Sequence, residues 1–558
     1  ITYKILFNDA VAMTGGQSHD GELTATDIIK ELQAVGVKKV VGVYDEKEDI
    51  VLSDFNNLAD IFPRDQLIEV QKMLTAIKGV TALVYIQTCA AEKRRRRKRG
   101  VFPNPDKRVF INPEVCEGCG DCGTKSNCVA ILPKDTNYGR KRQIDQSSCN
   151  KDFSCLDGFC PSFVSIEGAE LKKSVPKNFK LPDFKPPSIP KIEQTYNIVV
   201  TGVGGTGVVT VGALLAMGAY LDGKGVGVME MAGLAQKGGA VHIHCRIAER
   251  REDISAIRVA YGEAHSLIGG ELMVSAGEKT LSLLKRGQTK VVCSSNEANS
   301  GEFALDRNFS LPTNGMRLAI SSKVGDDNID FIDAVSLSKN FLGDSIYANI
   351  LLLGAAWQKG FIPLSMEAIK EAIRLNGAGV EGNLSAFDLG RWAAVDLKTL
   401  TDYSSRKETM LIDQDDLDAV IVNRKFQLEA YQNTKLARTF ETLVIEAKKK
   451  DTEFALAVAK GYHKLLAYKD EYEVARLHVS HLNESLCAEF EKFPKVSFYF
   501  APPFFNKKTK KHQQKKIKFG PWFVIVLKLL SKGKVLRGTA LDLFGYSQDR
   551  KKERALIR

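Results

Sequence analysis

Hydrophobic residues alternate between strand-like and helix-like spacing along the first hundred residues. The predicted order is strand, helix, strand, helix, strand, over residues 1–7, 24–36, 37–44, 65–79 and 80–88. Short glycine-containing turns join these segments, and such an order is typical of a parallel sheet covered by helices. Residues 1–107 are therefore predicted to form part of an α/β domain. Because the chain starts at Ile1 inside a strand-like run, we expect it to be an N-terminally truncated fragment.

The pattern changes several times further along the chain. Residues 108–170 lose apolar periodicity and are rich in cysteine, glycine and charge, so we expect something other than a hydrophobic core to order them. Residues 171–194 carry five prolines and read as an extended, semi-rigid linker. Residues 195–398 read as a second α/β domain, and residues 399–558 as a mainly helical domain. The predicted fold class is multidomain α/β.

Strands are predicted at four places within the second α/β domain after its first strand. They are residues 226–231, 241–247, 273–277 and 289–295. His242 and His244 alternate along one of these strands and are expected to pack or to face solvent. Cys245, Cys293 and Cys487 are isolated and are expected to be buried thiols.

Composition and charge narrow the functional classes. The chain has 558 residues and a net charge of +12, and much of the charge comes from residues 92–100 and 507–518. These basic runs lack the interleaved aromatics of a nucleic-acid site, so the first is interpreted as a surface segment, with docking of an acidic protein as the alternative. An uncharged run at 194–221 is long enough for a membrane span, but its centre is GVGGTG, a loop composition. We predict a cytoplasmic protein without membrane or nucleic-acid contacts.

Seven of the eleven cysteines lie between residues 116 and 160. Cys116, Cys119 and Cys122 form a C-x2-C-x2-C triplet, and Cys160 is followed by proline. This pattern is that of a [4Fe-4S] site in bacterial ferredoxins, in which a distant Cys-Pro supplies the fourth ligand. Zinc is the main alternative, although the triplet has one thiolate too many for a zinc knuckle. Disulfides are disfavoured in so large a chain.

The other three cysteines of the segment are Cys128, Cys149 and Cys155. A second cluster built on them would lack a fourth thiolate. A non-cysteine ligand, Cys89, a three-iron centre and the absence of a second cluster all remain open. One [4Fe-4S] cluster is predicted, with a second as an alternative.

Two further motifs carry candidate chemistry. In GVGGTG, Gly202, Gly204, Gly205 and Gly207 follow a strand and open a helix, so they fit either a dinucleotide loop, with Glu230 near a ribose, or a turn that packs the helix on the sheet. In NDAVAMTGGQ, Asn8 follows the first strand and could bind Mg²⁺ together with a nearby backbone carbonyl, while Gly15 and Gly16 could approach a diphosphate. A plain turn is the alternative for this second motif.

Taken in order, these motifs closely resemble the large fused indolepyruvate ferredoxin oxidoreductases. The matching stretches are NDAVAMTGGQ, QTCAAEKRRRRKRG, CEGCGDCGTKSNC, CNKDFSCLDGFCPSF, VTGVGGTGVVT, MAGLAQKGGAVHIH, GDSIYANILLLGAAWQKGFIPLS, AYKDEYEVARL, FGPW and LRGTALDLFG. The resemblance covers essentially the whole chain.

The resemblance implies a thiamine-diphosphate-binding domain over residues 1–107. Asn8 and the carbonyl of Ala10 would bind Mg²⁺, and Gly15, Gly16 and Gln17 would lie beside the cofactor. It also implies that GVGGTG in the γ-type domain need not bind NAD, and that MAGLAQKGG lines a contact with the rest of the enzyme or a coenzyme A region. An upstream GDG motif of the family is absent, so the chain alone is expected to be inactive.

The implied reaction is oxidative decarboxylation of an aryl 2-oxoacid, indolepyruvate, to the acyl-coenzyme A, with ferredoxin as electron acceptor. Pyruvate or branched-chain 2-oxoacids are alternative substrates. An NAD-linked iron-sulfur oxidoreductase and a pure electron-transfer module are rival interpretations. We further expect a homo-oligomer.

Overall fold

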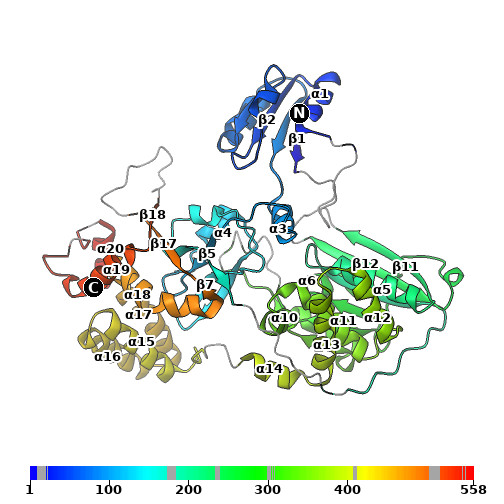
Figure 1. Cartoon of the computed structure of the whole chain (residues 1–558). Helices are drawn as coiled ribbons and strands as arrows, with labels where there is room; N and C mark the ends of the chain where they lie inside the picture. Colours follow the sequence, from blue (N-terminus) through cyan, green and yellow to red (C-terminus); the bar gives the residue numbers. More distant parts are fainter. Residues whose placement is uncertain are drawn as a thin grey trace.

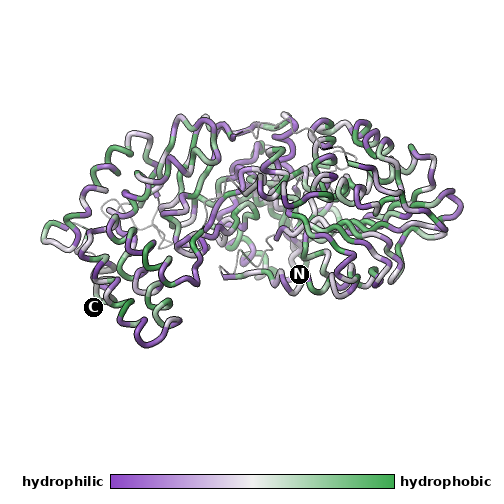
Figure 2. The backbone as a smooth tube through the Cα atoms, turned by 90° about the horizontal axis from the view of Figure 1, so that it is seen from below, coloured by the Kyte–Doolittle hydropathy of each residue, from purple (hydrophilic) through white to green (hydrophobic). Residues whose placement is uncertain are grey.

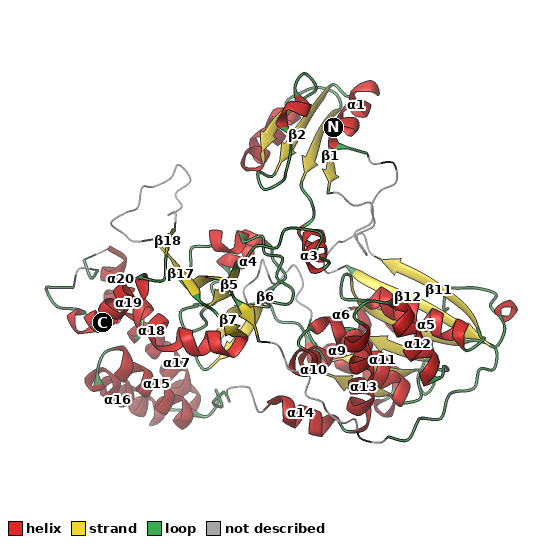
Figure 3. Cartoon of the chain, in the orientation of Figure 1, coloured by secondary structure: helices red, strands yellow, loops and turns green. Residues whose placement is uncertain are grey.

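The computed structural model describes most of the chain. The residues outside the description are 9–20, 22, 173–181, 183, 233–238, 298–302, 304–305, 307, 406–410, 502–515, 543, 547 and 558. Figure 1 shows the first α/β unit at the top, a larger α/β unit at the lower right, and the C-terminal helices at the lower left. The predicted multidomain α/β class is confirmed, with substantial helical content (Figure 3).

The first unit is a parallel sheet of four strands. Its members are β1 (Thr2–Phe7), β2 (Lys39–Tyr44), β3 (Asp60–Pro63) and β4 (Thr81–Ile86), in the order β1-β4-β2-β3. Helix α1 (Ala25–Ala34) packs on one face through Ile29, and α2 (Leu67–Thr75) packs on the other through Leu74. The carboxyl ends of all four strands meet at one edge, where parallel sheets place ligands.

The larger unit is built on a sheet of six strands. They are β10 (Tyr196–Val203), β11 (Gly225–Ala232), β12 (Ala240–Ala248), β13 (Ser266–Gly269), β14 (Lys290–Ser294) and β15 (Ile329–Ile332), in the order β11-β12-β10-β13-β14-β15. Strand β12 runs antiparallel to both of its neighbours, and the other pairs are parallel. Figure 2 shows hydrophobic residues running along the strands of this sheet.

Helices cover both faces of the six-stranded sheet. Helices α5 (Val208–Leu221), α10 (Ala334–Leu342), α11 (Ala348–Gln358), α12 (Met366–Asn376) and α13 (Val380–Val395) contribute to the core on one face. Helices α6 (Leu272–Ser275) and α9 (Thr313–Val324) contribute to the core on the other, with α7 (Glu278–Leu281) following α6. Helices α11 and α13 touch through glycines, since a Cβ at Gly390 would lie 1.8 Å from the carbonyl oxygen of Leu351. Helix α14 (Leu397–Ser405) ends the unit.

The cysteine-rich segment and the C-terminal region share one sheet. Strands β5 (Arg108–Ile111) and β8 (Phe163–Glu167) of the first pair with β17 (Lys495–Phe500) and β18 (Ile517–Phe519) of the second, in the order β18-β17-β8-β5. A smaller pair joins β9 (Glu170–Leu171) to β16 (Phe490–Lys492). Strands β6 (Ile131–Thr136) and β7 (Gly139–Ile144) form a hairpin in the cysteine-rich segment. The two segments therefore fold together.

Helices make up most of the rest of the C-terminal region. They are α15 (Leu417–Tyr431), α16 (Thr434–Lys448), α17 (Thr452–Leu466), α18 (Glu471–Glu489), α19 (Phe523–Lys532) and α20 (Gln548–Ile557). Asp470, which caps α18, receives two hydrogen bonds from the Arg537 guanidinium, at 2.5 and 2.8 Å, and both side chains are largely buried. This ion pair joins the chain after α19 to the start of α18.

Several expectations need correction. Residues 273–277 were expected to be a strand, but α6 occupies most of them because the Glu271 carboxylate accepts hydrogen bonds from the N–H groups of Met273 and Val274. The cysteine-rich segment does contribute to a hydrophobic core, which includes Val109, Ile111 and Phe163. Cys245 and Cys293 are buried as expected, whereas Cys487 is exposed. Within the described ranges, no helix is both long and apolar enough to cross a bilayer.

Candidate functional site

The loop that carries the cysteine triplet has a tightly constrained backbone. Gly118 and Gly120 take positive φ angles of 67° and 82°, and helix α4 (Asp121–Ser126) begins directly after Gly120. A Cβ at position 118 would lie 2.2 Å from the carbonyl oxygen of Arg140, so only glycine fits there. The N–H of Gly118 donates to the Cys116 sulfur at 3.3 Å. This turn separates Cys116 from Cys119, and α4 carries Cys122 in its first turn.

Four of the predicted ligands lie together. Burial, together with the charges of the neighbouring thiols of Cys116, Cys160 and Cys119, raises the pKa of Cys122 to about 12. Burial likewise raises the pKa of Cys160 to about 11, with Cys116 and Cys119 as charged neighbours. Cys119 is the exposed member of this set, which we call the first thiol set: Cys116, Cys119, Cys122 and Cys160.

The other three cysteines form a second thiol set of Cys128, Cys149 and Cys155. Burial raises the pKa of Cys155, and the thiols of Cys149 and Cys128 act in the same direction. Burial also raises the pKa of Cys149, and the neighbouring thiol of Cys128 acts in the same direction. Cys122 belongs to the electrostatic surroundings of Cys155, so the two sets lie next to each other.

Cationic side chains surround both sets. Arg142 interacts electrostatically with Cys122 and Cys116. Lys516 interacts in the same way with Cys160 and Cys155. Burial lowers the pKa of both cations, and the thiol charges oppose that effect. Because thiolate ligands carry negative charge, these cations fit a bound cluster held by deprotonated cysteines. Sequence reasoning missed them, since nothing in their local sequence distinguishes them from surface residues.

No group of three or more histidine, cysteine, aspartate or glutamate side chains is gathered to hold a metal ion in the part of the chain that the structure describes. All eleven cysteines are free thiols.

The basic run at 92–100 lies at the surface, as expected, but part of it packs against the cysteine-rich segment. Helix α3 (Ala90–Lys98) contains a buried glutamate, Glu92, which pairs with Arg95 and Arg96. Arg94 donates to the carbonyl oxygen of Ser147, and Arg97 donates to that of Asn150 at 2.5 Å. The run therefore lies at the surface but is partly packed: residues 93–97 are half-buried and residues 98–100 are exposed.

The carboxyl edge of the first sheet holds a polar network. Asp45 is buried and accepts from Arg64 at 2.8 Å and from Gln87 at 2.5 Å, and the hydroxyl of Tyr85 donates to Gln87 at 2.7 Å. Burial opposes ionisation of Asp45, yet its hydrogen bonds, including those from the Lys47 N–H and from Arg64, hold its pKa below the usual value. These residues were missed because they are scattered along the sequence.

The predicted cofactor residues lie at this same edge or outside the description. Asn8 directly follows β1, and its carbonyl oxygen accepts from the N–H of Cys89 at 3.4 Å. Ala10, Gly15, Gly16 and Gln17 lie outside the described residues, as does most of MAGLAQKGG. The edge of the sheet also meets the second thiol set, because the Lys47 ammonium donates to the carbonyl oxygen of Asp152 at 3.0 Å.

The glycine-rich loop is packed tightly against its own domain. Gly205 and Gly207 take positive φ angles, and α5 begins after Gly207. A Cβ at Gly202 would lie 2.6 Å from Val208, so this glycine lets the helix approach the strand. The N–H of Gly204 donates to the carbonyl oxygen of Gly239 at 2.9 Å, and the Asn349 amide donates to the backbone of Thr206 at 2.8 Å.

The strand order also separates Glu230 from the glycine loop. Glu230 lies on β11, and the antiparallel β12 is inserted between β11 and β10. With strands about 4.8 Å apart, this insertion moves Glu230 roughly 10 Å from the strand that leads into the loop. The ribose contact considered for Glu230 therefore lacks the neighbouring strand that a dinucleotide fold provides. His242 and His244 lie on β12, where both are buried, in agreement with the packing role expected for them.

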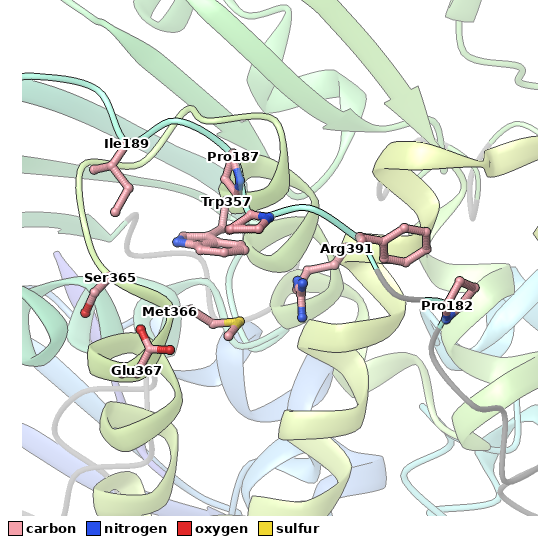
Figure 4. Close-up of a pocket in the computed structure, with 10 residues that line it drawn as sticks. Pro182, Pro187, Ile189, Trp357, Ser365, Met366, Glu367 and Arg391 are labelled. Atoms are coloured by element: carbon pink, nitrogen blue, oxygen red, sulfur yellow. The ribbon is translucent and has the colours of Figure 1, made fainter.

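A groove of about 700 Å³ runs between the proline-rich segment and helices α11 to α13. Figure 4 shows Pro187 and Ile189 on one side and Trp357, Glu367 and Arg391 on the other. The Trp357 ring nitrogen donates to the carbonyl oxygen of Leu364 at 3.0 Å, and Arg391 donates to Gln358 at 3.0 Å. Because these polar groups already form hydrogen bonds with protein atoms, we interpret the groove as a packing interface between the proline-rich segment and the helices rather than a ligand site.

Helix α18 reaches the cysteine-rich segment through a buried histidine. The Nε2–H of His478 donates to the carbonyl oxygen of Pro161 at 3.1 Å, and its Nδ1 accepts from Asn112 at 3.3 Å. Burial lowers the pKa of His478 to about 4, so the ring is neutral near pH 7. Lys469 donates to the carbonyl oxygen of Cys116 at 3.2 Å. The C-terminal region thus supports the first thiol set.

Comparison with known proteins gives matches over two parts of the chain. Residues 197–393 match a family described as "Pyruvate ferredoxin/flavodoxin oxidoreductase", and residues 417–558 match a "Family of unknown function (DUF6537)". The chain is 30% identical over 204 residues to indolepyruvate oxidoreductase subunit IorB of Thermococcus kodakarensis, covering 36% of this chain and 97% of that protein. It is 30% identical over 207 residues to the same subunit of Pyrococcus horikoshii, covering 37% and 98%.

Among solved structures, the γ subunit of keto/oxoacid ferredoxin oxidoreductase from Geobacter sulfurreducens is similar, with 23% identity and a TM-score of 0.26. That match covers 36% of this chain and 98% of the subunit.

Proposed function

The chain belongs to the keto-acid ferredoxin oxidoreductase family, through a domain of the indolepyruvate oxidoreductase IorB type, and on this premise we propose that it oxidatively decarboxylates an aryl 2-oxoacid. The proposed substrate is indolepyruvate, the product is the acyl-coenzyme A, and ferredoxin takes the electrons. The observation that carries the proposal is that one chain holds an IorB-type domain together with two neighbouring thiol sets.

We propose that thiamine diphosphate binds at the carboxyl edge of the first sheet, where Asn8 directly follows β1. The Asn8 side-chain oxygen and the Ala10 carbonyl would bind Mg²⁺, which prefers hard oxygen ligands. Gly15, Gly16 and Gln17 would lie beside the diphosphate. When bound, thiamine diphosphate would supply the electron sink for decarboxylation, and iron-sulfur clusters would carry the electrons away.

The two thiol sets are contacted by different parts of the chain. The second set is contacted from the first α/β unit and from α3, through Lys47 and Arg97. The first set is contacted from the C-terminal region, through Lys469 and Lys516. We infer that electrons pass from the sheet edge past the second set to the first set.

Ferredoxin would then dock near the exposed end of the first set. Cys119 is exposed there, Phe159 is 65% exposed, and Lys125 on α4 is also exposed. An acidic redox partner would be attracted to cations at such a surface. The role of the basic run on α3 is then to hold the Cys149 loop rather than to dock the partner.

The glycine loop is proposed as a packing device. Asn349 and Gly239 already pair with its backbone, which accounts for the glycines without a nucleotide. Titration of NADH against the protein is expected to give no saturable binding. A saturable response would support the NAD-linked alternative instead. Coenzyme A and a second copy of the chain are further proposed partners.

An assay of the purified holoenzyme with indolepyruvate, phenylpyruvate and pyruvate tests the substrate. Reduction of a viologen acceptor should depend on coenzyme A and thiamine diphosphate, and should be fastest with the two aryl substrates. Equal rates with pyruvate would overturn the aryl assignment while leaving the 2-oxoacid chemistry in place.

A further inference from the structure

The cysteine-rich segment contains two loops with the same spacing of polar ligands. In the first, Cys116, Cys119 and Cys122 are each separated by two residues. In the second, Cys149 and Cys155 are separated by five residues, and Asp152 stands midway between them. Asp152 therefore occupies the position in the second loop that Cys119 occupies in the first.

The backbone of the second loop repeats that of the first. Positive φ angles occur two and four residues after the first cysteine of each loop, at Gly118 and Gly120 and again at Lys151 and Phe153. The values for Lys151 and Phe153 are 53° and 66°. Residues other than glycine rarely adopt this conformation. Its presence at the same two positions of both loops therefore indicates that the two loops share one backbone conformation.

Hydrogen bonds repeat as well. The N–H of Lys151 donates to the Cys149 sulfur at 3.4 Å, as the N–H of Gly118 does to Cys116 at 3.3 Å. A helical turn follows each loop directly: α4 begins after Gly120, and a 3-10 turn (Ser154–Asp157) begins after Phe153. The two loops thus present their middle residues in equivalent places.

Asp152 is close to the second thiol set. Its negative charge acts on Cys149 and on Cys155, adding to the larger effect of burial on both thiols. The hydroxyl of Ser154 donates to one carboxylate oxygen of Asp152 at 2.6 Å and fixes its orientation. Cys89, the other candidate considered for a missing ligand, stands at the start of α3, where its N–H donates to Asn8.

We propose that Asp152 is the fourth ligand of a second iron-sulfur cluster, with Cys128, Cys149 and Cys155 as the other three. The inference rests on the iron-sulfur part of the proposed function. Carboxylate oxygen is a harder donor than thiolate, and soft thiolates are the usual ligands of iron-sulfur clusters. The iron at Asp152 is therefore the one most easily lost, which gives the site a chemical signature.

The test uses the whole chain, purified without oxygen, and measures iron, acid-labile sulfide and EPR spectra before and after mild oxidation. The wild type should contain about eight irons and lose about one on oxidation, with the EPR signal of a three-iron centre. D152C should keep about eight irons after the same oxidation. D152A should contain about seven before it. D157A changes an exposed aspartate five residues away and serves as the matched control, which should behave as the wild type.

The outcomes separate this inference from the proposed function. About four irons in the wild type would leave the proposed function standing with one cluster and would overturn the role of Asp152. Protein without iron would overturn both. Eight irons that are insensitive to D152A, or lost in C89S instead, would overturn the role of Asp152 alone. If D152A does not fold, the resistance of D152C to oxidation still decides the question.

Discussion

At Gly118 the chain passes so close to β7 that a side chain has no room. A Cβ would lie 2.2 Å from the carbonyl oxygen of Arg140, and the φ angle of 67° already disfavours other residues. Gly139, the first residue of β7, has a φ angle of 90° but no atom within 4 Å of the position of a Cβ. A substitution at Gly139 would therefore introduce backbone strain alone, whereas a substitution at Gly118 would introduce backbone strain and a steric clash.

We predict that G118A destabilises the cysteine-rich segment more than G139A does. Each substitution places a side chain at positive φ, which costs about 1–2 kcal/mol. G118A must also displace the Arg140 backbone, which adds about 1–3 kcal/mol. Urea unfolding, followed by the visible absorbance of the clusters, should give a lower midpoint for G118A, with roughly half the iron lost. Equal midpoints for the two variants would contradict the steric argument.

Some of the candidate site was predictable residue by residue, and some was not. The triplet and the Cys-Pro pair stand out because their spacing is regular. Asp152 stands at an equally regular position, yet an aspartate between cysteines carries no signal until it is counted against the first loop. Arg142 and Lys516 gave no signal, because they reach the thiols from elements that are distant in sequence.

At the scale of elements, local patterns predicted strands and helices well where the elements are long. Strands β1, β2, β4, β12 and β14 and helices α1 and α2 lie at their predicted positions. The four-residue strands β3 and β13 were missed, and α6 was taken for a strand, because a short apolar run does not distinguish a strand from a capped helical turn. The insertion of β12 between β10 and β11 could not be predicted, since alternation within a strand does not specify its neighbours.

The contact of α18 with the cysteine-rich segment should make the fold sensitive to acid. The folded-state pKa of His478 is lowered to about 4, below the ordinary value of 6.5, so the unfolded chain binds the proton more tightly. The stabilisation is complete above pH 6.5 and falls as the pH drops towards 4, by roughly 3 kcal/mol. Glutamine can keep both hydrogen bonds without titrating, so H478Q should lose less stability over this range.

Thermal unfolding of wild type and H478Q between pH 4 and pH 7 measures this effect. The midpoint of the wild type should fall more steeply with acid, and the difference between the two proteins should be largest near pH 4. H481Q, one turn further along α18, is the matched control and should follow the wild type. Parallel curves for wild type and H478Q would show that this contact does not contribute to acid sensitivity.

At the scale of the whole molecule, the order of segments in the sequence hides how they fold. Strand β8 pairs with β17 although more than 300 residues separate them, and this pairing places Phe498 against Val164. One core combines Phe110, Val164 and Ile166 with residues of α18, β17 and α19. The sequence predicts the individual segments, but it does not predict that the cysteine-rich segment and the C-terminal region share a sheet and a core. Pairing between strands this far apart in sequence leaves no local pattern.

The last prediction concerns which parts of the chain fold alone. A polypeptide of residues 190–405 contains both cores of the six-stranded sheet and the whole of residues 197–393, which match the oxidoreductase family. It should therefore unfold cooperatively in a thermal melt. A polypeptide ending at residue 405 lacks β17, α18 and α19, and so exposes Phe110, Val164 and Ile166.

Exposing those three side chains costs roughly 5–9 kcal/mol, which is comparable to the whole stability of a typical domain. The shortened chain should thus keep its six-stranded unit and lose the iron of the cysteine-rich segment, as iron analysis after anaerobic purification would reveal. Restoration of iron by adding residues 406–558 as a separate polypeptide would support this account. Full iron content in the shortened chain would contradict it, because the thiol sets would then be held without the shared sheet.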